Sequence, residues 1–270
     1  MILHFHGGAF VCMSSFQHSN YTRQWANMMK EDNVVVFSVD YRLAPENPFP
    51  IPFSDCFQVY CWIRTQAFKY LGIKPDQVIV TGDSAGGHLA CAITQLCIFE
   101  GFQPPDGCVM SYPSLMSDLK IFQPSVLLCL DDFLLSKDML LFSLISLHNE
   151  KIGDPFFNPI ASPCQVQDHI LAKFPRTRIL YCEMDPLRDS TMQFIWRMKK
   201  LNLNLEAYLL KEWCHGVLNF DLKIGGIPES HKANELNVKF YRELFNSPRQ
   251  KSALVGGPSN FQSNFALKSP

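Results

Sequence analysis

The chain has 270 residues, of which 47% are hydrophobic and 18% are charged, and its formal net charge at pH 7 is -1. A chain of this length and composition can build one large core, so we expect a single domain. The near-zero charge provides no basic field for nucleic acid or for an anionic membrane surface, so we expect small or neutral partners.

The ten cysteines are spread along the chain without a C-x-x-C pair, and several lie in apolar runs. This pattern is typical of reduced, buried thiols in an intracellular protein rather than of a disulfide scaffold. No apolar run in the sequence approaches the roughly 18 residues that a membrane-spanning helix needs. We therefore expect a cytoplasmic location.

In the first part of the chain, strand-like and helix-like segments alternate around a glycine loop at residues 6–9. The expected elements are a strand over 1–5, a helix over 15–30, a strand over 33–40, a proline-rich loop without regular structure over 41–52, and a helix over 53–70 that Gly72 ends. Because the sequence opens directly on the strand that leads into the glycine loop, we expect it to be truncated at its N-terminus.

The alternation continues to the end of the domain, which favours a parallel sheet covered by helices on both faces. The expected elements are strands over 77–81, 107–112, 177–183 and 203–211 and helices over 88–99, 189–201 and 229–245. One long interruption, about residues 114–174, contains a leucine-rich helical stretch at 136–148 and is interpreted as an inserted lid. We expect residues 1–246 to form the domain and residues 247–270 to be a disordered tail.

The most informative motif is Gly82-Asp83-Ser84-Ala85-Gly86-Gly87, which lies between a strand and a helix. This is the context of a G-x-S-x-G nucleophile elbow, in which glycines permit a strained turn that exposes the serine hydroxyl above the sheet. Three fixed positions also match by chance in a chain of this length. The serine therefore needs a base, an acid and an oxyanion hole elsewhere in the chain.

Asp185 and His215 are the candidate acid and base, since both follow predicted strands, where an open α/β sheet places functional groups. Taken alone, Asp185 is better explained as the N-cap of the following helix, and a lone loop histidine is usually a surface residue. The order Ser84, Asp185, His215 is nevertheless the order found in α/β-hydrolases, and it favours a catalytic triad.

The glycine loop lies upstream of the elbow, where an HGGG-type loop donates backbone N–H groups to an oxyanion hole. The candidate residues are Gly7, Gly8 and Ala9, together with Ala85 at the start of the elbow helix, where the helix dipole favours negative charge. An ordinary Gly-Gly turn is the alternative. Among the many phenylalanines, Phe10, Phe16, Phe156 and Phe157 are candidates to line an acyl pocket.

Metal and cofactor sites are not expected. His4 and His6 form an H-x-H pair, but no carboxylate or third histidine stands at a recognisable ligand spacing. Gly86-Gly87 is not followed by the Lys-Ser/Thr of a phosphate-binding loop.

Five motifs in one order resemble the hormone-sensitive lipase family of α/β-hydrolases over residues 1 to about 245, more closely its lipase branch than its arylacetamide deacetylase branch. The motifs are His6-Gly7-Gly8-Ala9-Phe10, Asp40-Tyr41-Arg42-Leu43-Ala44-Pro45-Glu46, Gly82-Asp83-Ser84-Ala85-Gly86-Gly87, Asp185-Pro186-Leu187-Arg188-Asp189 and His215-Gly216. Departures from the family pattern are Ala9 in place of a third glycine and Val217 in place of a phenylalanine.

The resemblance implies a carboxylic ester hydrolase that cleaves acylglycerols, cholesteryl esters or smaller acyl esters, with Ser84 as nucleophile, Asp185 as acid and His215 as base. It also implies that Asp189 and residues 41–46 support the site, and that the protein associates peripherally with lipid droplets. The competing hypothesis is a lipid-binding or regulatory chain that has retained the triad without turnover.

Overall fold

The computed structural model describes residues 1–117, 123–149, 154–222 and 224–247. A six-stranded sheet lies at its centre in the order β2-β1-β3-β4-β5-β6, and every neighbouring pair of strands is parallel. The strands are β1 Ile2–Phe5, β2 Val36–Val39, β3 Ile79–Asp83, β4 Gly107–Ser111, β5 Arg176–Met184 and β6 Leu205–Cys214. The parallel α/β architecture predicted from the sequence is confirmed.

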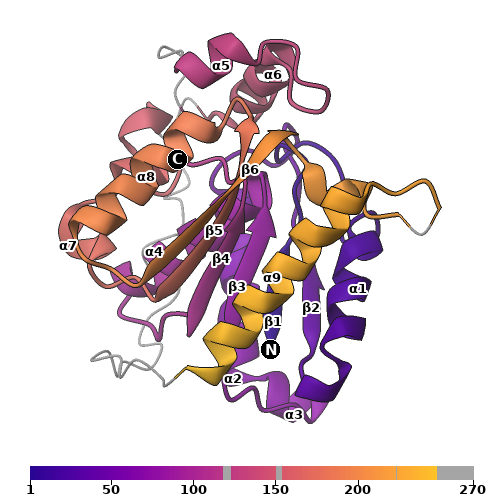
Figure 1. Ribbon diagram of the computed structural model, residues 1–270. Coiled ribbons are helices and arrows are strands. Elements are labelled where there is room, and N and C mark those ends of the chain that lie inside the picture. Colours follow the sequence, from indigo (N-terminus) through magenta and orange to yellow (C-terminus); the bar gives the residue numbers. More distant parts are fainter. Residues whose placement is uncertain (118–122, 150–153, 223, 248–270) are drawn as a thin grey trace.

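Helices connect successive strands. The α-helices are α1 Ser19–Met28, α2 Ile51–Thr65, α3 Ala67–Leu71, α4 Ala85–Phe99, α5 Pro124–Leu128, α6 Lys137–Leu147, α7 Asp168–Leu171, α8 Arg188–Lys200 and α9 Pro228–Asn246. Short 3-10 helices are η1 Lys30–Asp32, η3 Pro155–Phe157, η4 Pro163–Gln165 and η5 Val217–Phe220. Helices α1 and α9 cover one face of the sheet, and α2, α4 and α8 cover the other (Figure 1).

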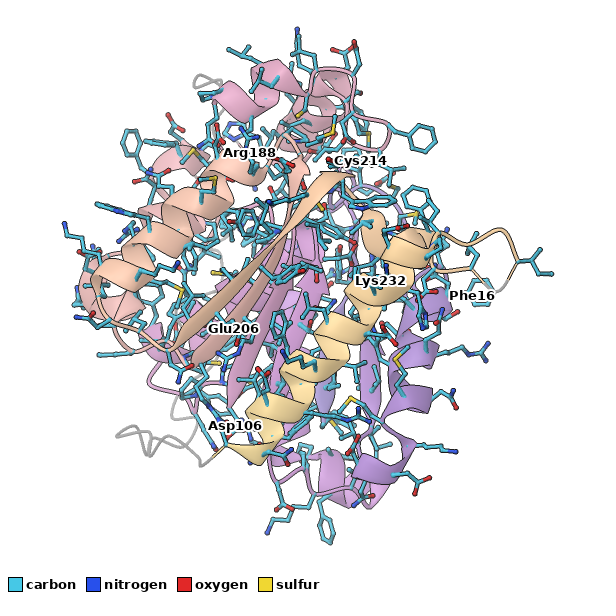
Figure 2. All side chains as sticks on the ribbon, in the orientation of Figure 1. Phe16, Asp106, Arg188, Glu206, Cys214 and Lys232 are labelled. Atoms are coloured by element: carbon cyan, nitrogen blue, oxygen red, sulfur yellow. The ribbon has the colours of Figure 1, made fainter. Side chains whose placement is uncertain are left out.

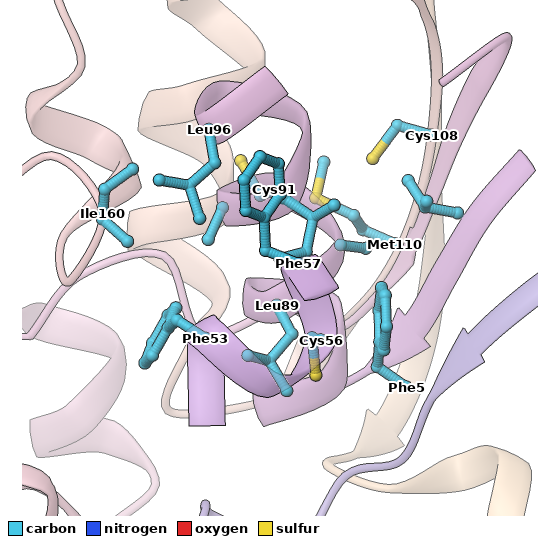
Figure 3. Packing of buried hydrophobic residues seen from close by; sticks show 14 of the residues in the cluster. Phe5, Phe53, Cys56, Phe57, Leu89, Cys91, Leu96, Cys108, Met110 and Ile160 are labelled. Carbon is cyan, nitrogen blue, oxygen red and sulfur yellow. The ribbon is translucent and has the colours of Figure 1, made fainter. Parts of the chain in front are cut away.

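The two faces of the sheet have separate apolar cores because successive side chains of a strand point to opposite faces. In β1, Ile2 packs with Trp25 of α1 and Tyr241 of α9, among other residues of that face. Leu3 and the other inward residues of the second face pack beneath α2 and α4, in the cluster shown in Figure 3. Burial on both faces explains why these strands are continuous apolar runs rather than alternating ones.

Helix α4 lies in the middle of the larger core. Fourteen of its 15 residues are buried. A helix that is apolar all round is expected only where protein surrounds it, and here α2, β3 and β4 contact it. Ser84 immediately precedes this buried helix, so the packing of α4 holds the backbone of Ser84 in place.

Some boundaries differ from the predicted ones for local reasons. Helix α2 begins at Ile51, inside the predicted proline loop, because Pro52 is in the first turn, where a missing N–H costs nothing. Helix α4 begins at Ala85, three residues before the predicted start. Strand β6 continues to Cys214, so the residues before His215 are strand rather than loop. Of the predicted tail 247–270, only Ser247 lies within the described residues.

All six strands run in the same direction, so their carboxyl ends meet at one edge of the sheet. Figure 2 shows Arg188 and Cys214 at this edge, near α5 and α6, and Asp106 at the opposite edge. Polar groups that follow different strands are therefore brought together beneath α5 and α6. No helix in the described part of the chain is long and apolar enough to cross a bilayer.

Candidate active site

Ser84 occupies a strained turn between β3 and α4, with φ 55° and ψ −120°. The turn forms because the flanking glycines let backbones approach closely: a Cβ on Gly82 would clash with the backbone of Gly86, and one on Gly86 would clash with the carbonyl oxygen of Phe5. The Ser84 amide donates to the carbonyl oxygen of Ser111 at 2.9 Å. These contacts hold the serine at the carboxyl edge of the sheet, as the elbow motif predicts.

Replacing Gly86 with alanine is expected to destabilise the fold by about 3 kcal/mol, because the new methyl group meets fixed backbone rather than a side chain that can move. Gly101 is the matched control. It has φ 64° and open space around its Cβ position. Gly101→Ala is therefore expected to cost only the left-handed backbone strain of about 1 kcal/mol. Urea unfolding compares the two, and equal losses would contradict the close-approach argument.

The structure brings Ser84, His215 and Asp185 together in a continuous hydrogen-bonded row. The Oγ of Ser84 lies 2.8 Å from Nε2 of His215, and Nδ1 of His215 lies 2.8 Å from Oδ2 of Asp185. Their exposed fractions are 7%, 5% and 1% respectively. An ionised carboxylate only accepts hydrogen bonds, so Nδ1 donates to Asp185 and Nε2 accepts from the serine hydroxyl.

Asp185 does not act as the N-cap of α8. The residue at that position is Leu187, and its side chain makes no cap. Instead Oδ1 of Asp185 accepts from the amide of Leu187 at 2.7 Å, which leaves Oδ2 for His215. The backbone turn therefore fixes the carboxylate with one oxygen directed at the imidazole.

The loop that carries His215 follows β6 and turns at Gly216, whose φ is 79°. The imidazole packs edge-on against the ring of Tyr112, with centroids 4.9 Å apart. Burial alone would lower the pKa of His215, but the charge and hydrogen bond of Asp185 outweigh burial and raise the pKa above its ordinary value of 6.5. Asp132 contributes in the same direction.

The glycine loop presents backbone amides beside Ser84. Gly8 has φ 115° and Ala9 has φ 55°, so the loop is left-handed at both positions. Within the described residues, the amides of Gly8 and Ala9 donate to no other group, and Ala85 has the open N–H of a first helical residue. The amide of Gly7, in contrast, donates to Oδ1 of Asp83 at 3.0 Å. Gly7 is therefore removed from the predicted donor set.

A buried polar network centred on Asp83 lies behind this loop. Besides the Gly7 amide, Oδ1 of Asp83 accepts from the hydroxyl of Tyr21 at 2.8 Å and lies 3.4 Å from Nε2 of His18. Burial would raise the pKa of the Asp83 carboxyl, but these partners hold it well below its usual range. An ionised Asp83 anchors the loop through Gly7.

His4 and His6 are both buried near this network, and burial lowers the pKa of His4 to about 3. His4 lies 3.1 Å from the hydroxyl of Tyr21, and His6 lies 2.7 Å from the carbonyl oxygen of Gly7. In the parts of the chain that the structure describes, no group of three or more metal-ligating side chains gathers.

Residues 41–46 contact the glycine loop directly. The hydroxyl of Tyr41 donates to the carbonyl oxygen of His6 at 2.8 Å. The amide of Ala44 donates to the carbonyl oxygen of Phe10 at 2.9 Å. Asp189 accepts from the amide of Ser125 at 2.8 Å and so ties α8 to α5. These contacts are consistent with the supporting role that the resemblance implies for both segments, and that role stays a prediction.

A pocket of about 150 Å³ opens at Ser84. Its lining includes Gly8 and Ala9 of the glycine loop, Ser84 and His215, and three apolar residues, of which Leu134 and Leu135 lie between α5 and α6 and Met139 lies in α6. The other lining residues are Cys12, Met13, His18, Asp83, Gly216 and Asn219. The predicted acyl-pocket phenylalanines are absent from this lining. Phe10 lies in the core against Phe53, whereas Phe16 and Phe157 are 83% and 74% exposed.

The sequence did not predict that His18 pairs with Asp83, that Asp132 lies near His215, or that Leu134, Leu135 and Met139 form an apolar wall of the pocket. Asp83 lies inside the elbow motif, and a charge buried there needs a partner, so the motif could have predicted one. Nothing in the local sequence distinguishes His18, Leu134, Leu135 or Met139 from other core or surface residues. Their roles depend on how distant segments pack.

A family model described as the alpha/beta hydrolase fold matches residues 2–219. The chain belongs to the α/β hydrolase fold family. The fold class predicted from the sequence is thereby confirmed. The resemblance is confirmed as well, since several hormone-sensitive lipases are relatives of this chain. The mouse hormone-sensitive lipase is 39% identical over 142 residues, which are 52% of this chain and 18% of that lipase. Across the bovine, mouse and human hormone-sensitive lipases, the match covers only 12% to 18% of the length of the lipase.

Other relatives of this α/β hydrolase match over more of their length. Esterase LipI of Mycobacterium tuberculosis is 30% identical over 86% of this chain and 69% of that protein. Arylacetamide deacetylase of Oryctolagus cuniculus is 26% identical over 90% of this chain and 73% of that protein. Among solved structures, the hyperthermophilic esterase of Pyrobaculum calidifontis superposes with a TM-score of 0.81 at 26% identity, over 91% of this chain and 77% of that chain.

Proposed function

We propose that this α/β hydrolase is a serine carboxylic ester hydrolase, with Ser84 as nucleophile, His215 as general base and Asp185 as the acid that orients the base. The observation that carries the proposal is the unbroken row of two 2.8 Å contacts from Asp185 through His215 to Ser84, which ends in the pocket. The esterase names of several relatives agree with it.

The reaction follows from this geometry. As Ser84 Oγ attacks the ester carbonyl carbon, Nε2 of His215 takes the hydroxyl proton, and Asp185 stabilises the resulting imidazolium. The tetrahedral intermediate collapses to an acyl-enzyme as His215 returns the proton to the leaving alcohol. Water then attacks the acyl carbon by the same route and releases the acid.

The oxyanion of both intermediates is stabilised by backbone donors. We propose the amides of Gly8, Ala9 and Ala85, which are uncommitted within the described residues and adjoin the serine. The amide of Ala85 adds the positive end of the α4 dipole. Removal of one such donor typically costs on the order of 100- to 1,000-fold in turnover.

The substrate class is set by the pocket wall. Leu134, Leu135 and Met139 offer an apolar surface to an acyl chain, and no lysine or arginine is among the described lining residues to attract an anionic substrate. We propose neutral acyl esters, with acylglycerols and cholesteryl esters as the larger candidates. We propose that the lid is narrower than 114–174 and centres on α5 and α6, since Leu115 near one end and Cys164 and Phe174 near the other belong to the main core.

The pH dependence follows from the raised pKa of His215. Only the neutral imidazole accepts the serine proton, so kcat/KM is expected to rise with pH through a midpoint above 6.5, the ordinary histidine value. Activity is lost on the acid side as the imidazole becomes protonated. The measurement is kcat/KM for p-nitrophenyl acetate across the neutral range. A midpoint clearly below the ordinary value would show that Asp185 does not stabilise the charged imidazole.

Turnover of p-nitrophenyl acetate by the purified chain tests the proposed activity. The competing lipid-binding hypothesis expects ligand binding without release of p-nitrophenol. A cytoplasmic location remains a prediction from the cysteine pattern and the apolar runs of the sequence, and peripheral association with lipid droplets remains a prediction from the resemblance. Flotation of the chain with oleate-loaded droplets tests the association, and its recovery only in the unbound fraction would contradict it.

A further inference from the structure

The segment between α5 and α6 is tied to the loop that carries His215 by a single carboxylate. Oδ1 of Asp132 accepts from the amides of Leu134 and Leu135 at 2.9 and 2.7 Å, and Oδ2 accepts from the amide of His215 at 3.1 Å. One half-buried side chain thus satisfies three backbone donors that come from two distant parts of the chain.

Two further contacts join the same two segments. A Cβ on Gly216 would collide with the side chain of Leu134, so the absence of a side chain at Gly216 lets Leu134 lie against the His215 loop. The ring of Phe133 lies 6.4 Å from that of Phe220, centroid to centroid. The segment that forms the pocket wall is therefore packed on the loop that holds the base.

We propose that Asp132 is a positioning residue that couples the pocket wall to His215, so that displacement of Leu134 and Leu135 also displaces the base. The inference rests on the proposed function for its catalytic meaning. Each carboxylate oxygen serves one side of the link: Oδ1 shapes the wall and Oδ2 holds the backbone of the base. A substrate that moves the wall would thereby alter the reactivity of the site.

The charge of Asp132 also acts on the imidazole. The charged and titratable groups that face His215 are Asp185 after β5, Asp132 from the wall segment, Asp83 at the end of β3 and Tyr112 after β4, with the thiol of Cys214 preceding it in β6. Asp132 is the member of this group that lies in the same segment as the pocket-lining residues Leu134 and Leu135. Its displacement would remove one negative charge from the surroundings of the base.

Asp132→Asn separates the two halves of the link. The amide oxygen of asparagine can still accept from Leu134 and Leu135, but its NH₂ group cannot accept from the amide of His215. Asp131→Asn is the matched control, because Asp131 is exposed, adjacent and without a hydrogen bond or ion pair among the described residues. Both variants lose one negative charge at neighbouring positions.

Amide hydrogen exchange measured by NMR on the full chain is the primary test. In Asp132→Asn, exchange at His215 is expected to accelerate about tenfold, with Leu134 and Leu135 unchanged, and Asp131→Asn is expected to match wild type. The acid limb of kcat/KM is also expected to move to lower pH in Asp132→Asn alone. Should that variant not fold, Asp132→Ser, which keeps a small acceptor for the turn, takes its place.

Unchanged exchange at His215, or equal effects of the two asparagine variants, would overturn the proposal. The exchange result does not depend on catalysis, so it distinguishes this inference from the proposed function. A wild-type chain that hydrolyses no ester refutes the proposed function, and exchange at His215 then decides the coupling by itself.

Discussion

Ser84→Ala is expected to reduce kcat for ester hydrolysis by on the order of 10⁴- to 10⁶-fold, the loss seen when the nucleophile of a serine triad is removed. The reason is geometric: no other side chain lies in hydrogen-bonding distance of Nε2 of His215 among the described residues. Water would have to replace the serine without the elbow that positions it. The measurement is the initial rate with p-nitrophenyl acetate.

The same chemical change at a remote site is the control for Ser84→Ala. Ser54 lies in α2, where its hydroxyl accepts from the side chain of Gln58, and its replacement by alanine is expected to leave the rate unchanged. Thermal unfolding should show that both variants fold like wild type. A Ser84→Ala chain that retains more than about a tenth of the wild-type rate would exclude Ser84 as the nucleophile.

Asp185→Asn is expected to lower kcat by about 10⁴-fold with little change in stability. The asparagine oxygen can still accept from the amide of Leu187, so the turn survives. Its NH₂ group, however, faces Nδ1 of His215, which forces the imidazole to carry its proton on Nε2. In that tautomer the base cannot accept the proton of Ser84.

Asp189→Asn provides the comparison for this effect, because Asp189 lies four residues further along and its Oδ2 binds the amide of Ser125 rather than the base. We expect at most about a tenfold loss there, as for a supporting hydrogen bond. If the two asparagine variants lost activity equally, the role assigned to Asp185 would be wrong, and the loss would reflect general disturbance of the α8 region.

Chain order and turn chemistry predicted the parts of the site that depend on local sequence. The elbow at Ser84 needed glycines at two positions where backbones touch, and this requirement is visible in the motif itself. Asp185 and His215 follow strands, so a parallel sheet had to place them at one edge. The structure brings the three together, and their catalytic role remains the proposal that the experiments above address.

The parts that could not be predicted depend on contacts between distant segments. The glycine loop motif does not reveal that the Gly7 amide is already bound to Asp83. The pocket wall comes from Leu134, Leu135 and Met139, which the sequence does not distinguish from other leucine-rich helical residues. Phe10, which aromatic content favoured for the pocket, has a left-handed backbone and stacks on Phe53 in the core instead.

Labelling by a fluorophosphonate probe, followed by peptide mass spectrometry, tests the central claim most directly. The probe reacts with a serine only when a base and an oxyanion hole activate it, so it reports the assembled site rather than the fold. We predict one covalent adduct per chain, on Ser84, and none on Ser84→Ala. A folded wild-type chain that remains unlabelled, or that is labelled at another residue, would contradict the account.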